Sequence, residues 1–377
     1  MSTKFTALEI GKGDAFLLEE PENNWKCLFD AGGSKGTIVS LLRKKKIANI
    51  NLAICSHNDD DHANGFIGLL RSNIQIDEIW LPGTWASVLK YVKDNGIGPE
   101  EAGFLVEVVC KYYGKAPNGS SCQIDDDASN AEVYNDRDLF DSETEEPIED
   151  FDDSLYCISE LIDLEYNIMK LHPFLYHYLY HCKHGIGIKY RSLVMAIDRI
   201  IKIAGLAYQK GCKIRWFNPV NSCTRNSVDY GFVALNSNEM FCVQKPKNAL
   251  NFALLCSLTV ENEYSLVFEY LKDGIPILRF SADSDCTCQS RSYDEDIIVT
   301  APHHGSEAND VVYNNLMGNK IIWVRSDSKS RKRPCSVFKG LKKKCCLACF
   351  NYNFKKEICF EYSNKQWIKI KGNICNC

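Results

Sequence analysis

The segment HNDDDH, residues 57–62, places two histidines and three aspartates within six positions. Three consecutive carboxylates repel one another unless positive charge lies among them. Imidazole and carboxylate side chains together suit Zn²⁺, Mn²⁺ or Fe²⁺, and a carboxylate-rich set favours the harder ions. Alternate side chains of this segment would face inward in a loop that follows a strand. We therefore expect the segment to bind divalent metal, as a pair of ions; the alternative is a solvated polar loop.

The other histidines fall in two places. His303 and His304 are adjacent in TAPHHGS, residues 300–306. Eight histidines scattered through a core would not be expected to group in this way. The remaining four are expected to be surface residues of an aromatic helix, with the alternative that one from the face shared by positions 177, 181 and 184 reaches the metal site. These four are His172, His177, His181 and His184.

Five short motifs follow one another along the chain: IGKGDAFLL at 10–18, LFDAGG at 28–33, SHNDDDHANG at 56–65, ILRFSADSD at 277–285 and TAPHHGS at 300–306. In type and order they resemble the motifs of the metallo-β-lactamase-fold hydrolases. More closely, they resemble the branch with S-H-x-D-x-D-H and P-H-H-G-S motifs, which includes the hydrolase domain of bacterial DNA-uptake competence proteins. The resemblance covers residues 4–85 and 212–325.

The resemblance implies a fold of the α/β class, an αββα metallo-β-lactamase sandwich, with two divalent metal ions, Zn or Mn. One ion would lie between His57 and Asp59, and the other between Asp61 and His62. Asp283 would bridge the two ions. The full set of metal ligands that the resemblance implies is His57, Asp59, Asp61, His62, Asp283 and His303.

Two residues, Asp61 and His304, are implied to act in catalysis. His304 would orient the substrate or donate a proton to the leaving group, although either His303 or His304 could be the ligand. Asp30 would orient other residues of the site. In many members a further histidine binds the first ion, but the matching segment RWFNPVN, residues 215–221, has none. We therefore expect one of the two sites to be weak.

The implied reaction is hydrolysis by water, because two cations would depress the pKa of a bound water molecule from 15.7 to about 7. The branch leans toward phosphodiesters. Residues 320–344 hold ten Lys or Arg against one acid, Asp327, and could follow a phosphate backbone. We therefore expect a phosphodiesterase or nuclease whose substrate is DNA or RNA. The alternatives are a solvated basic face, hydrolysis of a thioester or lactone, and a degenerate metal-binding interaction module.

Strands and helices must position these motifs. Short apolar runs alternate with helical patterns over residues 4–85, and strand patterns return after residue 212, which is typical of a layered α/β fold. We expect one metallo-β-lactamase-like domain over residues 1–377. It would carry a mostly helical insertion at 86–211 and a basic, Cys-rich C-terminal extension at 326–377.

The insertion contains an acidic loop, residues 125–153, with fourteen Asp or Glu and one basic residue, Arg137. Such a run is typical of a solvated loop; the alternative is a regulatory or nucleic-acid-mimicking arm. A cytoplasmic nuclease must be restrained, and this loop would occupy a basic groove until a trigger or a regulatory protein partner releases it. That arrangement would suit an effector of bacterial antiviral defence.

The overall composition sets further limits. A net charge of −5 over 377 residues gives no global nucleic-acid signal. The first residues lack a secretory signal, and no apolar run approaches the roughly 20 residues of a membrane span. We therefore expect a cytoplasmic protein without membrane contact, whose 19 cysteines are reduced. Cys346, Cys349, Cys375 and Cys377 have a loose zinc-knuckle spacing, but we expect ordinary thiols, with a structural zinc site as the alternative.

Overall fold

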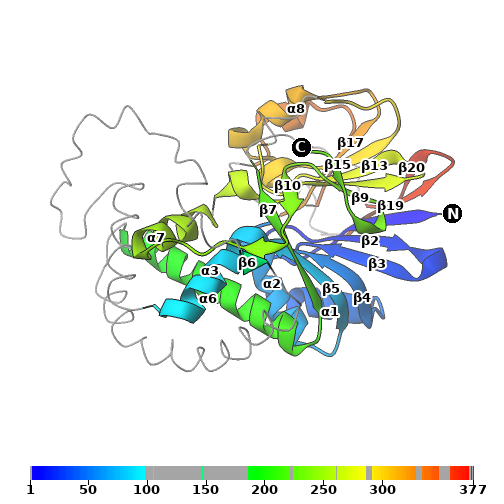
Figure 1. The fold of residues 1–377 in the computed structure, drawn as a ribbon. Coiled ribbons are helices and arrows are strands. Elements are labelled where there is room, and N and C mark those ends of the chain that lie inside the picture. Colours follow the sequence, from blue (N-terminus) through cyan, green and yellow to red (C-terminus); the bar gives the residue numbers. More distant parts are fainter. Residues whose placement is uncertain are drawn as a thin grey trace, which may run out of the picture. The chain divides into compact units, whose positions relative to one another are not determined.

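The computed structural model describes residues 2–97, 186–220, 224–259, 261–285, 291–327, 333–347 and 357–372, together with positions 105, 146, 147, 375 and 377. Within these residues the chain forms seven α-helices and mixed β-sheets (Figure 1), which confirms the expected α/β class. The chain separates into two compact units. The first comprises Met1–Pro82, Lys210–Glu239 and Glu261–Cys377, and the second comprises Gly83–Gln209 and Met240–Val260.

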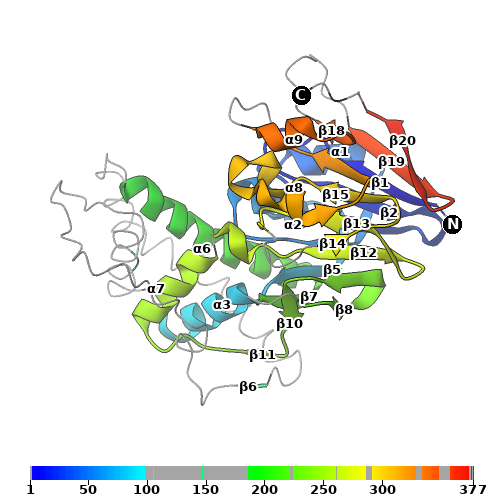
Figure 2. The same cartoon turned by 90° about the horizontal axis from the view of Figure 1, so that it is seen from above.

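The first unit contains a nine-stranded sheet. Its middle strands β3, β4, β5 and β7 are parallel, and the strands at both edges pair antiparallel. The strands β19 and β20, which lie in the expected C-terminal extension, extend this sheet beyond β1 (Figure 2). In spatial order the strands are β10 (Ser237–Glu239), β7 (Lys213–Pro219), β5 (Gln75–Pro82), β4 (Asn49–Ile54), β3 (Trp25–Phe29), β2 (Phe16–Glu20), β1 (Thr3–Ala7), β19 (Ile358–Ser363) and β20 (Gln366–Lys371).

A second sheet of the same unit has seven strands. Its β13, β15, β17 and β18 are parallel, whereas β12, β9 and β8 pair antiparallel. In spatial order the strands are β18 (Lys344–Cys346), β17 (Ile321–Arg325), β15 (Ile297–Thr300), β13 (Ile275–Phe280), β12 (Phe268–Lys272), β9 (Phe232–Ala234) and β8 (Asn226–Ser227). A small parallel pair, β14 (Arg291–Ser292) with β16 (Leu316–Met317), lies apart from this sheet.

The two large sheets pack face to face through a continuous apolar core. Phe29 of the first sheet stacks on Phe280 of the second with ring centroids 4.3 Å apart, and Trp80 meets Phe268 at 5.4 Å. Alternate residues of each strand enter this core, because successive side chains of a strand point to opposite faces. The ends of β3 and β13, from which Asp30 and Asp283 follow, are therefore anchored by the buried aromatic side chains of Phe29 and Phe280.

Helices cover the outer faces of these sheets. Val312 of α8 (Val311–Asn315) and Phe338 of α9 (Ser336–Gly340) pack on the second sheet opposite the shared core. Helix α1 (Thr37–Lys44) packs against α2 (Asp60–Arg71), which begins at the HNDDDH segment. Gly65 and Gly68 lie on the contact face of α2, where a Cβ atom would come within 1.9 Å of Ala31 O and 1.7 Å of Lys35 O. Only glycine permits this approach.

The second unit is built around three helices in its described part: α3 (Gly83–Asn95), α6 (Ile186–Gln209) and α7 (Ala249–Leu258). Tyr91 of α3 stacks on Phe252 of α7 with centroids 4.4 Å apart, and Lys245 pairs with Asp94 at 3.0 Å. Asn248 caps α7 by accepting a hydrogen bond from the Asn251 amide. A short strand pair, β6 (Glu146–Pro147) with β11 (Cys242–Val243), completes the described elements of this unit.

Several expectations fall on other parts of the chain. Apart from positions 146 and 147, the acidic loop at 125–153 lies outside the described residues, as do Cys349 and the four central histidines His172, His177, His181 and His184. The division into one domain, an insertion and an extension stays a prediction. None of the helices in the described part combines the length and apolar character needed to cross a bilayer.

Candidate metal centre

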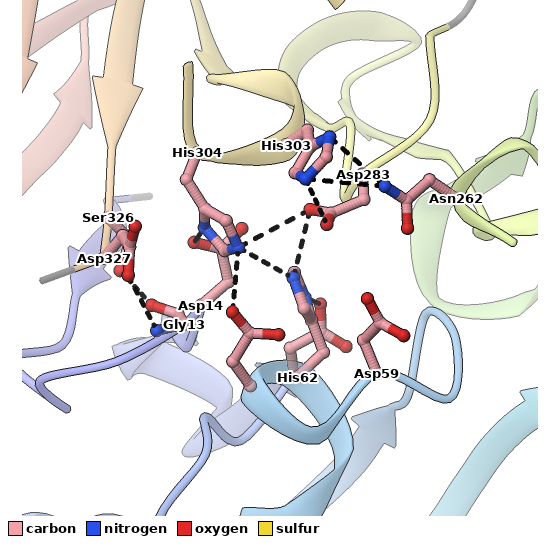
Figure 3. A network of polar contacts seen from close by, with 12 residues as sticks. Gly13, Asp14, Asp59, His62, Asn262, Asp283, His303, His304, Ser326 and Asp327 are labelled. Atoms are coloured by element: carbon pink, nitrogen blue, oxygen red, sulfur yellow. Dashed lines mark hydrogen bonds and ion pairs between the residues drawn. The ribbon is translucent and has the colours of Figure 1, made fainter. Parts of the chain in front are cut away.

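Two groups of potential metal ligands meet in the first unit and share the buried carboxylate of Asp283 (Figure 3). In each group, one ligand atom per residue lies within 4.8 Å of every other. All of these residues are buried except Asp59, which is partly exposed. The first group is His57, Asp59 and Asp283; the second is Asp14, His62, Asp283 and His304. We call the two groups together the Asp/His centre.

The Asp283 carboxylate separates the histidines into two pairs. On its Oδ1 side, the Nε2 atoms of His62 and His304 lie 3.1 and 3.8 Å away. On its Oδ2 side, the Nε2 atoms of His57 and His303 lie 3.8 and 3.7 Å away. The structure thus brings the predicted bridging residue between the two halves of the site. The Oδ2 side is the wider one, because its shortest nitrogen–oxygen distance is 3.7 Å, against 3.1 Å on the Oδ1 side.

The sequence positions these side chains at the ends of core strands. The segment with His57 and Asp59 follows β4, and Asp59 stands immediately before α2, which carries His62. Asp283 follows β13, and the PHHG turn follows β15. The carboxyl ends of these strands meet at one edge of the molecule, as in other α/β folds whose ligands bind beyond the strand ends.

Each of three histidines has its outer nitrogen engaged, which leaves Nε2 directed inward. His62 Nδ1 donates to Asp30 Oδ2 at 2.8 Å, and His57 Nδ1 lies 2.9 Å from the Ser56 hydroxyl oxygen. That hydroxyl donates to Asp30 Oδ2 at 2.8 Å, so its oxygen can accept from His57. His304 Nδ1 donates to Asp14 Oδ1 at 3.0 Å. Outer partners of this kind fix the tautomer and orientation of metal-binding imidazoles.

Asp30 thus acts as the sequence suggested, as a residue that orients others. Its Oδ1 accepts the Ser56 amide at 2.8 Å, in addition to the two contacts of Oδ2. Its own backbone is left-handed, with φ of 56°. An aspartate held in this sparsely populated region indicates that the surrounding structure requires the turn, as is common at functional sites.

The structure separates His303 from His304, either of which could be the ligand on the motifs alone. His304, rather than His303, lies with His62, where the two Nε2 atoms are 3.2 Å apart. His303 is turned to the other side of Asp283, and its Nδ1 lies 3.0 Å from Asn309 Oδ1. Both residues have left-handed backbones, with φ of 45° and 54°, in the turn that places their side chains on opposite sides of Asp283.

Asp14 is a site residue that the motifs did not single out. It follows a turn in which Gly13 has φ of 91°, and a Cβ on Gly13 would lie 1.6 Å from Asp61 O. The Asp14 amide donates to that same oxygen at 3.2 Å. The glycine therefore allows the first hairpin to dock directly on α2 and to bring Asp14 beneath His304. The signal in the sequence was the G-x-G-D spacing, whose tight turn requires positive φ.

The three consecutive aspartates take different positions. Asp60 points outward, with its side chain 53% exposed, and pairs with Lys12 at 3.0 Å. Asp61 is buried, and its Oδ2 lies 3.4 Å from the inward Nε2 of His304. Asp14 meets the outward Nδ1 of the same ring. Asp61 is thus better placed to share an ion with His304, and Asp14 to orient the ring.

Electrostatic coupling within the centre is strong. Burial alone would lower the pKa of His304, but Asp14 and Asp283 outweigh burial and raise it to about 10. Burial likewise opposes the shift at His62, whose pKa Asp283 and Asp30 raise well above its usual value. Burial would raise the pKa of Asp283, but His62 and His304 hold it well below its usual range. Protonated imidazoles therefore balance the carboxylates of the metal-free centre.

The donor set and its spacing fit divalent metal. An ion with bonds of about 2.0–2.1 Å in tetrahedral geometry separates its ligand atoms by about 3.3 Å. The inward atoms of His62, His304 and Asp283 Oδ1 approach one another at 3.1–3.8 Å. Among the described residues, His57 Nε2 and Asp14 Oδ2 are buried without a hydrogen-bond partner. Buried polar atoms rarely remain unsatisfied, and bound ions are one reason when they do.

The basic stretch at 320–344 is not a continuous exposed row in its described part. Arg325 is fully buried. Neighbouring carboxylates reduce the positive charge of three further side chains, and a nucleic-acid contact along this stretch stays a prediction. The pairs are Lys320 with Glu295 at 3.5 Å, Arg333 with Asp327 at 3.4 Å and Lys343 with Asp296 at 4.0 Å.

Comparisons of the sequence with known proteins assign no family. No protein-family model matches the chain, and no curated protein matches it significantly. The resemblance to metallo-β-lactamase-fold hydrolases therefore stays an expectation based on motifs. Any function for this chain rests on the chemistry of the Asp/His centre, since a fold alone does not choose an activity.

Proposed function

We propose that this protein is a metal-dependent hydrolase that cleaves phosphodiester bonds and acts as a nuclease. The single observation that supports this most is the carboxylate of Asp283, buried between two His/Asp groups. Paired ions that share a ligand are used to stabilise both the attacking and leaving oxygens in phosphoryl transfer. We further propose that the two facing sheets, with the motifs at their strand ends, form a metallo-β-lactamase sandwich.

In this proposal the two sides of Asp283 hold one divalent ion each, Zn²⁺ or Mn²⁺. His62, His304 and Asp61 would serve the Oδ1 side, and His57 and Asp59 the Oδ2 side. Bound there, such ions lower the pKa of water to about 7 and neutralise charge that develops on a phosphoryl group. The Oδ2 side would bind more weakly, because its donor atoms are farther apart and the Asp59 side chain is 36% exposed.

We propose that His303 is the general acid of the reaction. Its side chain is 23% exposed, whereas those of His57, His62 and His304 are at most 2% exposed. Its Nδ1 can donate to Asn309 Oδ1, which fixes the ring, and its Nε2 lies 3.7 Å from Asp283 Oδ2 and 3.5 Å from Asn262 Nδ2. We propose that Nε2 carries a proton to the leaving oxygen of the substrate.

A polyanionic substrate also agrees with a surface pocket between α1 and α2. Lys35, Arg43 and Arg71 line it together with Ser40 and Ser72. Guanidinium, ammonium and hydroxyl groups are the common partners of phosphate oxygens. Arg71 and Ser72 stand at the C-terminal end of α2, whereas the Asp/His centre lies at its N-terminal end, so we propose that this pocket contacts a long polyanion away from the bond that is cleaved.

The direct test compares Asp283→Asn with Asp60→Asn. Single-stranded and duplex DNA, RNA and small phosphodiesters are incubated with the purified chain and Mn²⁺ or Zn²⁺, with chelator as the blank. Loss of the shared carboxylate should reduce the rate by more than about 100-fold, the upper range for loss of an outer partner alone. Asp60→Asn changes an exposed aspartate of the same run and should retain activity.

Each other outcome of this test has a clear meaning. Hydrolysis of thioesters or lactones only, lost in Asp283→Asn, would replace the phosphodiester substrate. Metal binding with no hydrolysis of any ester would favour an interaction module. Equal nuclease rates in wild type and Asp283→Asn would refute the proposed site.

The proposed role of His303 has a separate test. His303→Gln should lower kcat by about 10²–10⁴-fold, the usual contribution of a positioned proton donor, with bound metal unchanged. His304→Gln should instead reduce the metal content, because it removes an inward nitrogen. If His303→Gln also lost its metal, His303 would be a ligand, as the motifs implied.

A further inference from the structure

A second cluster of metal-ligating side chains lies outside the Asp/His centre. The Sγ atoms of Cys346, Cys375 and Cys377 all lie within 4.8 Å of one another. Cys346 is buried at the end of β18, and the other two come from the C-terminal segment after β20. These three residues form a small cluster of their own, which we call the thiol cluster.

We propose that the thiol cluster supplies three of the four ligands of a structural zinc ion, independent of the proposed activity. Thiolate is the preferred structural ligand of Zn²⁺, with bonds of about 2.3 Å that separate tetrahedral sulfurs by about 3.8 Å. The limit of 4.8 Å for the three Sγ atoms accommodates that spacing with small side-chain movements. A zinc ion there would fasten the C-terminal segment to β18, an edge strand of the second sheet.

The arrangement differs from that of ordinary buried thiols. On β18, Cys345 belongs to the core between the sheets, whereas Cys346 faces the C-terminal cysteines. Cys375 Sγ and Cys377 Sγ are 3.1 Å apart, well beyond the 2.03–2.05 Å of a disulfide bond. As thiolates, three sulfurs this close would repel one another unless a cation lay among them.

A buried arginine links this cluster to the Asp/His centre. Arg325 Nη1 donates to Cys346 Sγ at 3.1 Å, and Arg325 Nε donates to the His304 carbonyl oxygen at 2.6 Å. The guanidinium is fully buried, so water does not reach it. Its positive charge offsets part of the negative charge that three thiolates bring. The zinc would thus help to hold the turn that carries His304, without contact with substrate.

Cobalt substitution tests this proposal, because sulfur-to-cobalt charge-transfer absorption requires thiolate ligands, which the Asp/His centre lacks. The full chain, purified under reducing conditions and freed of metal, is titrated with Co²⁺. We expect this absorption in wild type and its loss in Cys375→Ser and Cys377→Ser. Asp283→Asn should keep it, as should the control Cys242→Ser, which changes a partly buried cysteine outside the cluster.

A second measurement does not depend on the folding of cysteine variants. X-ray absorption at the zinc edge of Asp283→Asn protein, loaded with one equivalent of zinc, should show three or more sulfur neighbours at about 2.3 Å. Two or fewer sulfur neighbours, or a wild-type protein without charge-transfer absorption, would overturn the proposal. So would a disulfide among these three cysteines in the native protein, seen as a mass lower by two hydrogens.

Discussion

The guanidinium of Arg325 contacts both the backbone of His304 in the Asp/His centre and Cys346 of the thiol cluster, yet the two sites are supported in different ways. In the Asp/His centre, the Nδ1 atoms of His57, His62 and His304 each contact a neighbouring side chain, which fixes the ring and directs Nε2 inward. In the thiol cluster the Arg325 guanidinium donates to Cys346 Sγ, and two of the cysteines are only partly buried.

This difference reflects what each site would do. A site that activates water must hold its ligands rigidly while it leaves a position open to substrate, and outer hydrogen bonds supply that rigidity. A structural site can be closed by its ligands alone, and its own bonds to metal supply the rigidity. The predictions below should therefore affect the two sites unequally.

The largest effect is expected where the hairpin docks on α2. Gly13→Ala should destabilise the protein by about 3 kcal/mol or more, because it combines a left-handed backbone with a clash against Asp61 O. Gly11→Ala is the matched control, since Gly11 has φ of 85° but nothing within 4 Å of a Cβ. It should cost only about 1–2 kcal/mol. Urea denaturation measures both, and equal losses would mean that the close approach to Asp61 is unimportant.

A smaller effect is expected from the outer partner Asp30. Asp30→Asn removes a charge that orients both Ser56 and His62, and it should weaken metal binding at the Asp/His centre by about 10–100-fold. Competition with a chromogenic chelator measures this affinity. The sulfur-to-cobalt absorption of the thiol cluster should not change. If both sites weakened equally, the variant would have damaged the whole fold instead.

The smallest expected effect is the change in metal affinity at the Asp/His centre for each pH unit. Metal must displace protons from His62 and His304, whose pKa values are raised, so affinity at the Asp/His centre should increase by about 10-fold or more per pH unit between pH 6 and 8. Calorimetric titration at several pH values should show proton release. An affinity independent of pH would contradict protonated imidazoles in the metal-free centre.

The stability of the metal-free protein should change in the opposite direction. A histidine whose pKa is raised from 6.5 to about 10 on folding stabilises the fold fully below pH 6.5. That contribution is lost as the pH rises toward 10. The free energy of unfolding in chelator should thus fall between pH 7 and 10, and His304→Gln should reduce this dependence.

Much of this arrangement was readable from the sequence because its chemistry is local. The adjacent carboxylates of HNDDDH repel one another, which by itself predicts a bound cation. The alternation of strands and helices follows from the apolar periodicity of the sequence. The expected alternation holds for the outward Asp60 and the inward Asp61 but fails at Asn58, which is fully buried, because the segment passes from a loop into helix α2 at Asp60. The orienting role of Asp30 was implied by the resemblance of LFDAGG to a family motif.

Other features depend on contacts that no local pattern encodes. Asp14 enters the centre only because Gly13 lets two distant segments touch, and His303 and His304 are the same residue type in neighbouring positions. Their opposite directions occur in a turn of two left-handed residues, which tertiary structure imposes. The burial of Arg325 also could not be expected from a stretch so rich in basic residues.

The most direct measurement of the central claim is anomalous diffraction from crystals of the protein loaded with Mn²⁺ or Zn²⁺. The account predicts a strong peak on the Oδ1 side of Asp283, beside the Nε2 atoms of His62 and His304. A weaker peak is predicted on the Oδ2 side, beside His57. Metal-loaded crystals with no peak next to Asp283 would contradict the account.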